Sequence, residues 1–142
     1  GTTARLVTFA KVAGAGEVPP VFTLSKSQPY VASIAAYDNG RVAVSAGSSS
    51  EVTTTAVVTP SLDAPSGGVL LSLGGVVVNT TFTPDTGLTE LVDLATPAAA
   101  TYKATLTLAE SSVAEGPTST HTLTPGSPSK WITQSILLVP VL

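Results

Sequence analysis

The sequence contains few of the residues that usually carry chemistry. Its 142 residues include no cysteine, no methionine, one histidine and one tryptophan. The lack of cysteine excludes disulfide scaffolds, cysteine-based zinc sites and thiol nucleophiles. Charged residues make up 11% of the chain, where about a quarter is ordinary. Acid–base catalysis would have to use nine scattered carboxylates and one imidazole, so we expect that the protein is not an enzyme.

The charge and hydropathy patterns exclude two further classes of partner. The formal net charge is -3, which offers no basic footprint for a nucleic acid. No stretch of 18 apolar residues occurs, so we expect no membrane span, and the longest apolar run, residues 67–78, is interrupted by glycine. The absence of cysteine and methionine, with very few side-chain amides, is typical of thermostable proteins.

Three patterns resemble catalytic or metal-binding motifs but lack the surroundings that such sites need. Residues 85–87 read Asp-Thr-Gly, the tripeptide of aspartic proteases, but a proline precedes them and indicates a surface turn. His121 lies in a threonine-rich alternating segment with no nucleophile elbow in the chain. Glu90 and Asp93 are the closest useful acidic pair, which is too sparse for a calcium loop. We therefore expect no catalytic residue, no metal site and no cofactor.

Strand patterns separated by turn residues dominate the chain. Asp-Asn-Gly at residues 38–40 predicts a tight hairpin turn, and residues 84–87 and 124–126 predict further turns. The only helical pattern is residues 86–95, where Leu88, Leu91 and Val92 share a face. The sequence therefore predicts an all-β fold: one antiparallel β-sandwich domain over residues 1–142, with about eight to ten strands and at most one short connecting helix. The expected strands lie near residues 5–13, 21–25, 30–37, 41–46, 51–59, 69–73, 76–83, 102–109, 119–123 and 131–139.

One local segment resembles a known superfamily. In residues 97–108, a proline–alanine corner leads into Tyr102, which opens a strand of clean alternation. This segment resembles the tyrosine corner of immunoglobulin-like and fibronectin type III domains. The resemblance implies an immunoglobulin-like sandwich in which the Tyr102 hydroxyl bonds to the backbone. Ala104 stands where antibody-type domains carry a cysteine, so only disulfide-free branches fit, and the resemblance implies no specific function.

The two ends of the sequence are unusually apolar. Residues 136–142 contain no polar side chain, and the first expected strand, residues 4–13, has only two charges. Exposed apolar strands favour aggregation. Both segments can be strands of the sandwich itself, or one of them (4–13 or 131–142) can dock on a neighbouring subunit by β-strand addition. In the second case the contact residues would be Leu6, Phe9, Val12, Ile136, Leu138, Val141 and Leu142.

These observations favour a non-catalytic structural protein. The leading hypothesis is a subunit that self-assembles into an extracellular, pilus-like filament or a cell-surface layer, with further copies of itself as partner. The first alternative is a virion protein, above all a decoration (cement) protein bound to a capsid lattice. The second alternative is a carbohydrate-binding or adhesive module, for which Trp131 beside Lys130 is the available surface aromatic.

Overall fold

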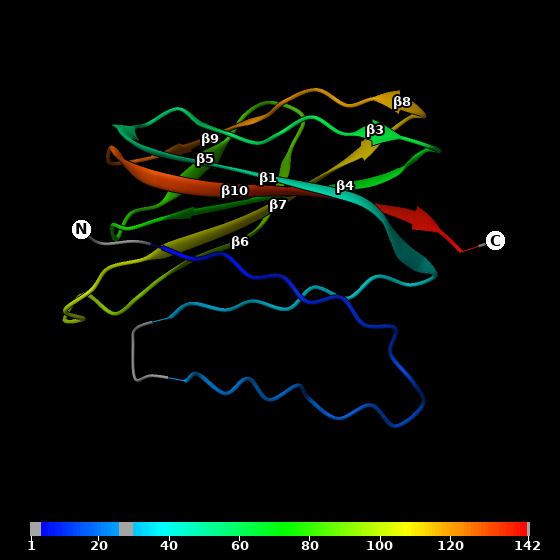
Figure 1. Cartoon of the computed structure of the whole chain (residues 1–142), viewed down its shortest axis with the longest axis horizontal. Coiled ribbons are helices and arrows are strands. Elements are labelled where there is room, and N and C mark those ends of the chain that lie inside the picture. The colour runs from blue at the N-terminus through cyan, green and yellow to red at the C-terminus, as the bar shows by residue number, and fades with distance from the viewer. Residues whose placement is uncertain (1–3, 26–29, 142) are drawn as a thin grey trace.

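The computed structural model describes residues 4–25 and 30–141, and these residues form ten strands and no helix (Figure 1). All strand pairs are antiparallel, and the predicted all-β, sandwich-like fold is confirmed. In the described residues, no helix is long and apolar enough to cross a membrane. The strands are β1 (Gly40–Thr54), β2 (Val57–Val58), β3 (Asp63–Ala64), β4 (Gly68–Val76), β5 (Phe82–Pro84), β6 (Thr89–Ala95), β7 (Thr105–Val113), β8 (Gly116–Pro117), β9 (Thr122–Pro125) and β10 (Ser129–Pro140).

A five-stranded sheet in the order β1-β10-β4-β7-β6 forms the centre of the molecule. Successive residues of a strand point to opposite faces, and β4 is buried on both of them. Leu70, fully buried, points to the face that we call inner, whereas Leu71, 8% exposed, points to the outer face. Leu71 lies opposite Ile136 of β10 and Glu110 of β7, which fixes the register of the three central strands.

Two smaller sheets, β2-β9-β5 and β3-β8, cover the inner face and complete the sandwich (Figure 1). Apolar side chains from both layers meet in two clusters. One cluster comprises Leu62, Ala64, Leu70, Leu137 and Val139, and the other Val57, Val76, Phe82 and Leu123.

Hydroxyl groups connect the two layers of the sandwich. The hydroxyl of Thr133 donates to the carbonyl of Val58 at 3.0 Å, and that of Ser135 donates to the carbonyl of Pro60 at 2.6 Å. Both side chains lie on the inner face of β10 and are almost completely buried. The threonine and serine content of the chain therefore satisfies buried polar backbone atoms as well as supplying surface polarity.

The helix expected at residues 86–95 is wrong, because most of this segment forms strand β6. Its apolar spacing would give only about two helical turns, which are marginal alone in water. Pairing with β7 instead satisfies the backbone along the strand. A register shift between Glu90 and Val92 leaves Leu91 as the extra residue, and this bulge produced the helix-like spacing.

The turns expected at residues 38–40 and 84–87 are present. Asn39 has φ of 53° and Gly87 has φ of 96°, conformations that asparagine and glycine tolerate. The second turn joins β5 to β6, where a helix was expected to follow it. The first leads into β1 without forming a hairpin, since residues 30–37 are not part of a sheet.

The chain before β1 forms a third, irregular layer, which we call the arm: residues 4–25 and 30–38. It runs below the large sheet in three extended passes, residues 4–13, 18–25 and 30–37 (Figure 1). Strands were expected in each of these passes, but none is assigned there. The first and third passes lie over the outer face of the sheet, whose backbone groups are already paired within the sheet, and the second pass lies farther from it (Figure 1).

Candidate assembly interface

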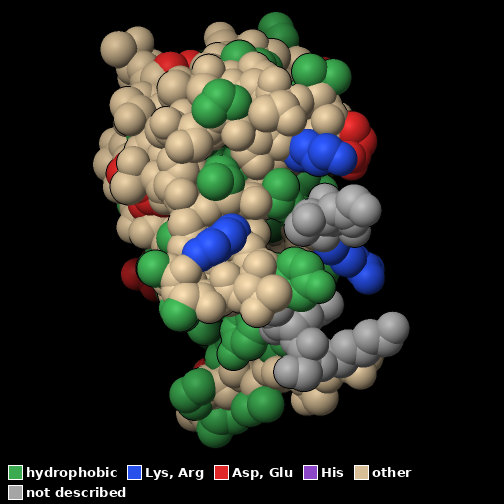
Figure 2. All heavy atoms as spheres, turned by 90° about the vertical axis from the view of Figure 1, so that its left-hand side faces the viewer, with side chains coloured by type: hydrophobic (Ala, Val, Ile, Leu, Met, Phe, Trp, Pro, Cys, Tyr) green, Lys and Arg blue, Asp and Glu red, His purple; other side chains and the backbone are tan. Residues whose placement is uncertain are grey.

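The arm exposes most of the large apolar side chains found on the surface. In the described residues, fifteen large hydrophobic side chains are exposed, and nine of them lie in the arm. The arm makes up less than a quarter of the described residues. Val12 is 83% and Val21 is 88% exposed. Figure 2 shows hydrophobic side chains gathered at the lower end of the molecule, where the arm lies. The nine are Val7, Phe9, Val12, Val18, Val21, Phe22, Leu24, Tyr30 and Ile34.

The outer face of the large sheet, which faces the arm, carries a third apolar cluster. This outer cluster is formed by residues of β4, β7 and β10, and only two arm residues, Leu6 and Tyr37, pack against it. Leu6 is also half-buried, whereas every other residue of 4–25 is exposed. Leu6 and Tyr37 are thus the apolar anchors of the arm on this face. The buried members of the outer cluster are Leu71, Leu73, Leu108 and Ile136.

The first pass is tethered to the sheet by one side-chain hydrogen bond. The hydroxyl of Thr8 and the side-chain oxygen of Gln134, on the outer face of β10, are 2.6 Å apart. An open groove of about 450 Å³ remains beside this contact. It is lined by residues 5–8 of the arm together with residues 47–49 of β1 and 132–134 of β10. The first pass therefore rests loosely on the sheet.

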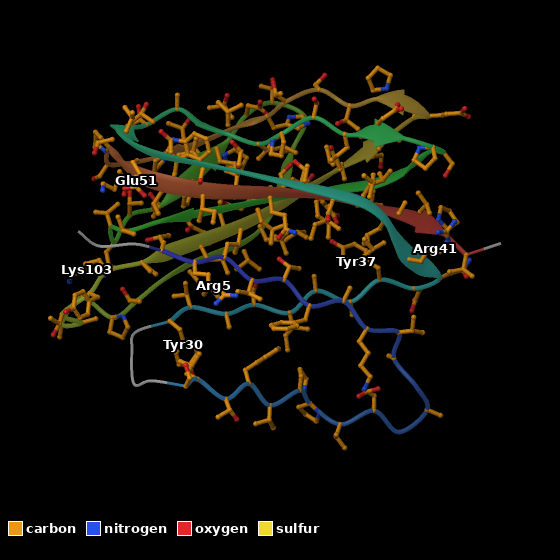
Figure 3. The ribbon with its side chains drawn as sticks, viewed as in Figure 1. Arg5, Tyr30, Tyr37, Arg41, Glu51 and Lys103 are labelled. Atoms are coloured by element: carbon orange, nitrogen blue, oxygen red, sulfur yellow. The ribbon has the colours of Figure 1, made fainter. Side chains whose placement is uncertain are left out.

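The third pass is held more firmly, through Tyr37 (Figure 3). Its hydroxyl donates to a carboxylate oxygen of Glu110 at 2.7 Å. Burial, followed by the hydrogen bond to Glu110 and the negative charge of that residue, raises the pKa of Tyr37 well above its ordinary value. A second open groove, of about 370 Å³, runs between residues 34–37 and strands β6 and β7. The contact fixes the end of the arm that leads into β1.

The first and second passes are joined by a glycine-rich turn that is held only by its own residues. The amide of Glu17 donates to the carbonyl of Gly14 at 3.2 Å, and Gly16 has φ of 75°. Lys11 pairs with the Glu17 carboxylate at 2.6 Å, and this contact lowers the pKa of Glu17. The rings of Phe9 and Phe22 also meet, with centroids 5.6 Å apart. None of these interactions involves the sandwich.

The structure separates the two groups of residues that the sequence suggested as subunit contacts. In the N-terminal group, Leu6 packs on the outer cluster, whereas Phe9 and Val12 are 71% and 83% exposed. In the C-terminal group, Ile136 and Leu138 belong to β10, which is hydrogen-bonded to β1 on one side and β4 on the other. Ile136 and Leu138 lie on its outer face and help to form the surface that the arm covers.

The chain beyond β10 contributes little to this surface. Val141 is 47% exposed, and its amide donates to the carbonyl of Asn39 at 2.9 Å, which ties it to the turn before β1. Leu142 lies outside the described residues. Of the two segments expected to dock on a neighbour, only residues 4–13 are free of ladder pairing.

The two aromatic residues singled out in the sequence, Tyr102 and Trp131, lie in environments that differ from the expected ones. Tyr102 is 60% exposed in the connection between β6 and β7, whereas a tyrosine corner would hold it against the backbone. Trp131 packs against the inner cluster around Val57 and Phe82, and its indole nitrogen is buried without a partner among the described residues. Trp131 is thus half-buried rather than a fully exposed surface aromatic.

The acidic residues and the histidine have structural partners. The carboxylate of Asp85 lies 3.0 Å from Nδ1 of His121 and accepts a hydrogen bond from the amide of Thr122 at 2.9 Å. These contacts fasten the turn after β5 to β9. Asp93 accepts from the amide of Phe82 at 2.8 Å. Over residues 4–25 and 30–141, no group of three or more potential metal ligands comes together.

One signal for the outer cluster was present in the sequence. Residues 69–73 read Val-Leu-Leu-Ser-Leu, a nearly continuous apolar run, which is typical of strands buried on both faces. It indicates that a further layer covers the outer face of β4. The partners Tyr37 and Glu110 are 73 positions apart and have no local signature.

No protein-family model matches the chain, and no curated protein or solved structure matches it either. The resemblance to immunoglobulin-like domains therefore rests on the short segment around Tyr102 alone. The arm and the sheet face that it covers are the features of the molecule that point to a function.

Proposed function

We propose that the protein is a non-catalytic structural subunit that self-assembles into an extracellular filament or surface layer. One observation carries this proposal: the arm presents nine large apolar side chains to solvent on extended backbone with no ladder partners. Contiguous exposed apolar surface marks interaction sites in folded proteins. Extended backbone with free hydrogen-bonding groups is the form in which a segment adds to another chain.

The magnitude of the exposed apolar surface supports assembly. Full burial of one large apolar side chain contributes about 1.5–3 kcal/mol, so covering all nine would contribute on the order of 15 kcal/mol. Association itself is opposed by about 4–15 kcal/mol of lost freedom. The arm alone can therefore supply the free energy for a stable contact. Further stabilisation follows by mass action, because neighbours bind the folded chain only.

The rest of the molecule fits a structural role. The carboxylates of Asp85 and Asp93 accept hydrogen bonds from backbone amides, so they brace turns and strand ends. The buried hydroxyls of Thr133 and Ser135 connect the two layers of the sandwich. A compact body of this kind, with an exposed apolar segment attached, suits a repeating subunit.

The proposal is tested on the full chain by light scattering over a range of concentrations and by negative-stain electron microscopy. The unchanged protein is expected to form particles much larger than one subunit. A triple variant, Phe9→Ser with Val12→Ser and Val21→Ser, is expected to remain a folded monomer, since each side chain is more than two-thirds exposed. The matched control is Val52→Ser on β1, which is 71% exposed but outside the arm and should assemble normally.

Two results would contradict the proposal. One is an unchanged protein that stays monomeric at every concentration, and the other is a triple variant that assembles as well as the control. The shape of the particles separates the alternatives: filaments or sheets support the proposal, whereas binding only to a preformed capsid supports a virion decoration protein.

A further inference from the structure

We infer that residues 4–13 of one copy bind the outer face of the large sheet of the next copy, whose own residues 4–13 bind a further copy in turn. The inference rests on the proposed function and names the segment that is given and the surface that receives it. Exchange of an identical element between copies needs no new complementary surface, because the receiving face already fits the segment.

The contacts that hold the first pass to its own sheet are few. They are the packing of Leu6 on the outer cluster and the contact between Thr8 and Gln134, which is exposed to solvent. A hydrogen bond of this kind contributes only about 0.5–1.5 kcal/mol net. All other residues of the pass are exposed. Release of the segment breaks these contacts together with those of Phe9 with Phe22 and of Lys11 with Glu17, and it leaves the sandwich intact.

The turn at residues 14–17 provides the hinge. A side chain built at Gly14 or Gly16 would meet nothing within 4 Å, so the body does not restrict this turn. If it opens, the ten residues of the first pass can extend about 33–36 Å. The contact between Tyr37 and Glu110 lies beyond the hinge and keeps the rest of the arm in place.

The receiving surface includes an unpaired strand edge that a segment from a neighbour can use and the chain's own segment does not. Strand β1 is an edge of the large sheet, and it lines the groove that the first pass fills incompletely. Residues 42–50 of this edge contain neither a charge nor a proline, the features that usually block strand addition. The opposite edge, β6, carries Glu90 and Asp93. A segment donated by a neighbour can keep the contacts on the outer face and pair in addition with the free edge of β1, which the chain's own segment does not do.

Paired single-cysteine variants test the exchange directly, because the natural chain has no cysteine. Chains carrying Thr8→Cys are mixed with differently tagged chains carrying Gln134→Cys, assembled, treated with a flexible bismaleimide and denatured. A covalent dimer of the two tagged chains can form only between copies, and in an equal mixture we expect up to about half of the chains to shift into it, since the other contacts join two chains of the same kind. The control mixture, Tyr37→Cys with Glu110→Cys, is expected to give no such dimer, since that contact stays within one chain.

The double variant Thr8→Cys with Gln134→Cys separates failure of this inference from failure of the proposed function. We expect it to give a ladder of cross-linked species after assembly. Large assemblies whose chains are cross-linked only internally would overturn the exchange and leave the proposed function standing. Failure of the unchanged protein to assemble would overturn both.

Discussion

The hydroxyl of Tyr37 and the carboxylate of Glu110 are joined by a 2.7 Å hydrogen bond that connects the end of the arm to the outer face of β7. The contact lies next to the turn that leads into β1. It divides the arm into a fixed base and a long free part, residues 4–25, of which only Leu6 is not classed as exposed. Most apolar side chains of this part are therefore exposed to solvent rather than packed in the core.

Alkaline titration is expected to reveal the Tyr37 contact. The pKa of Tyr37 is raised in the folded chain, so its stabilising contribution is complete below the ordinary value of about 10 and is lost as the pH rises through the folded value. The tyrosinate absorbance of the natural chain, minus that of Tyr37→Phe, should rise only above pH of about 10. In urea the same difference should shift back to the ordinary value. A folded-state difference already complete near pH 10 would show that the contact does not form.

Neutralising Glu90 is expected to stabilise the sandwich at neutral pH. Partial burial, followed by the charge of Asp93, raises the pKa of Glu90, so its contribution is present at low pH and is lost as the pH rises through the folded value. Urea unfolding should show Glu90→Gln to be slightly more stable than the natural chain at pH 7, with a smaller gain at pH 4. Glu115→Gln, at an exposed position, serves as the control. An equal gain at both pH values would exclude this cause.

Gly68→Ala is expected to destabilise the large sheet. A Cβ atom at Gly68 would collide with the backbone carbonyl of Leu138 in the neighbouring strand, and that carbonyl cannot move without disturbing β10. Overpacking of this kind costs about 1–3 kcal/mol. Gly14→Ala is the matched control, because its Cβ would meet nothing within 4 Å. Thermal unfolding measures both, and similar melting temperatures would refute the close approach of β4 and β10.

Ser135→Ala is expected to weaken the connection between the two layers. The Ser135 hydroxyl is fully buried and donates to the carbonyl of Pro60, which would lose this partner. An unpaired buried polar group costs about 1–3 kcal/mol. The control is Ser45→Ala on the exposed face of β1, which should change the free energy of unfolding by no more than about 0.5 kcal/mol. Equal unfolding free energies for the two variants would contradict the role of the buried hydroxyl.

The sequence predicted the sandwich well where strands pair in a sheet. Alternation near residues 102–109 and 131–139 corresponds to β7 and β10, although β7 begins and ends later than expected and β10 extends further at both ends. The same alternation failed in the arm, because periodicity identifies an extended segment but does not say whether a pairing edge is available. At residues 86–95 a bulge imitated helical spacing, and pairing with β7 decided the outcome.

The sequence predicted only part of the candidate interface. Apolar composition singled out Phe9 and Val12, which the structure leaves exposed. It singled out Ile136 and Leu138 as well, which lie in a central strand and form part of the covered face. Composition reports which segments are apolar, whereas the topology decides which of them is already paired. The long-range contact of Tyr37 with Glu110 depends on that topology, and no local pattern encodes it.

Hydrogen exchange of the backbone amides in residues 4–13, measured by mass spectrometry, is the most direct test of whether this segment joins one copy to the next. In dilute, dissociated protein these amides have no ladder partners and should exchange rapidly. After assembly we expect the exchange of these amides to slow strongly, while the exchange of residues 30–37, held by Tyr37, changes little. Rapid exchange of residues 4–13 in fully assembled material would contradict the claim that this segment joins one copy to the next.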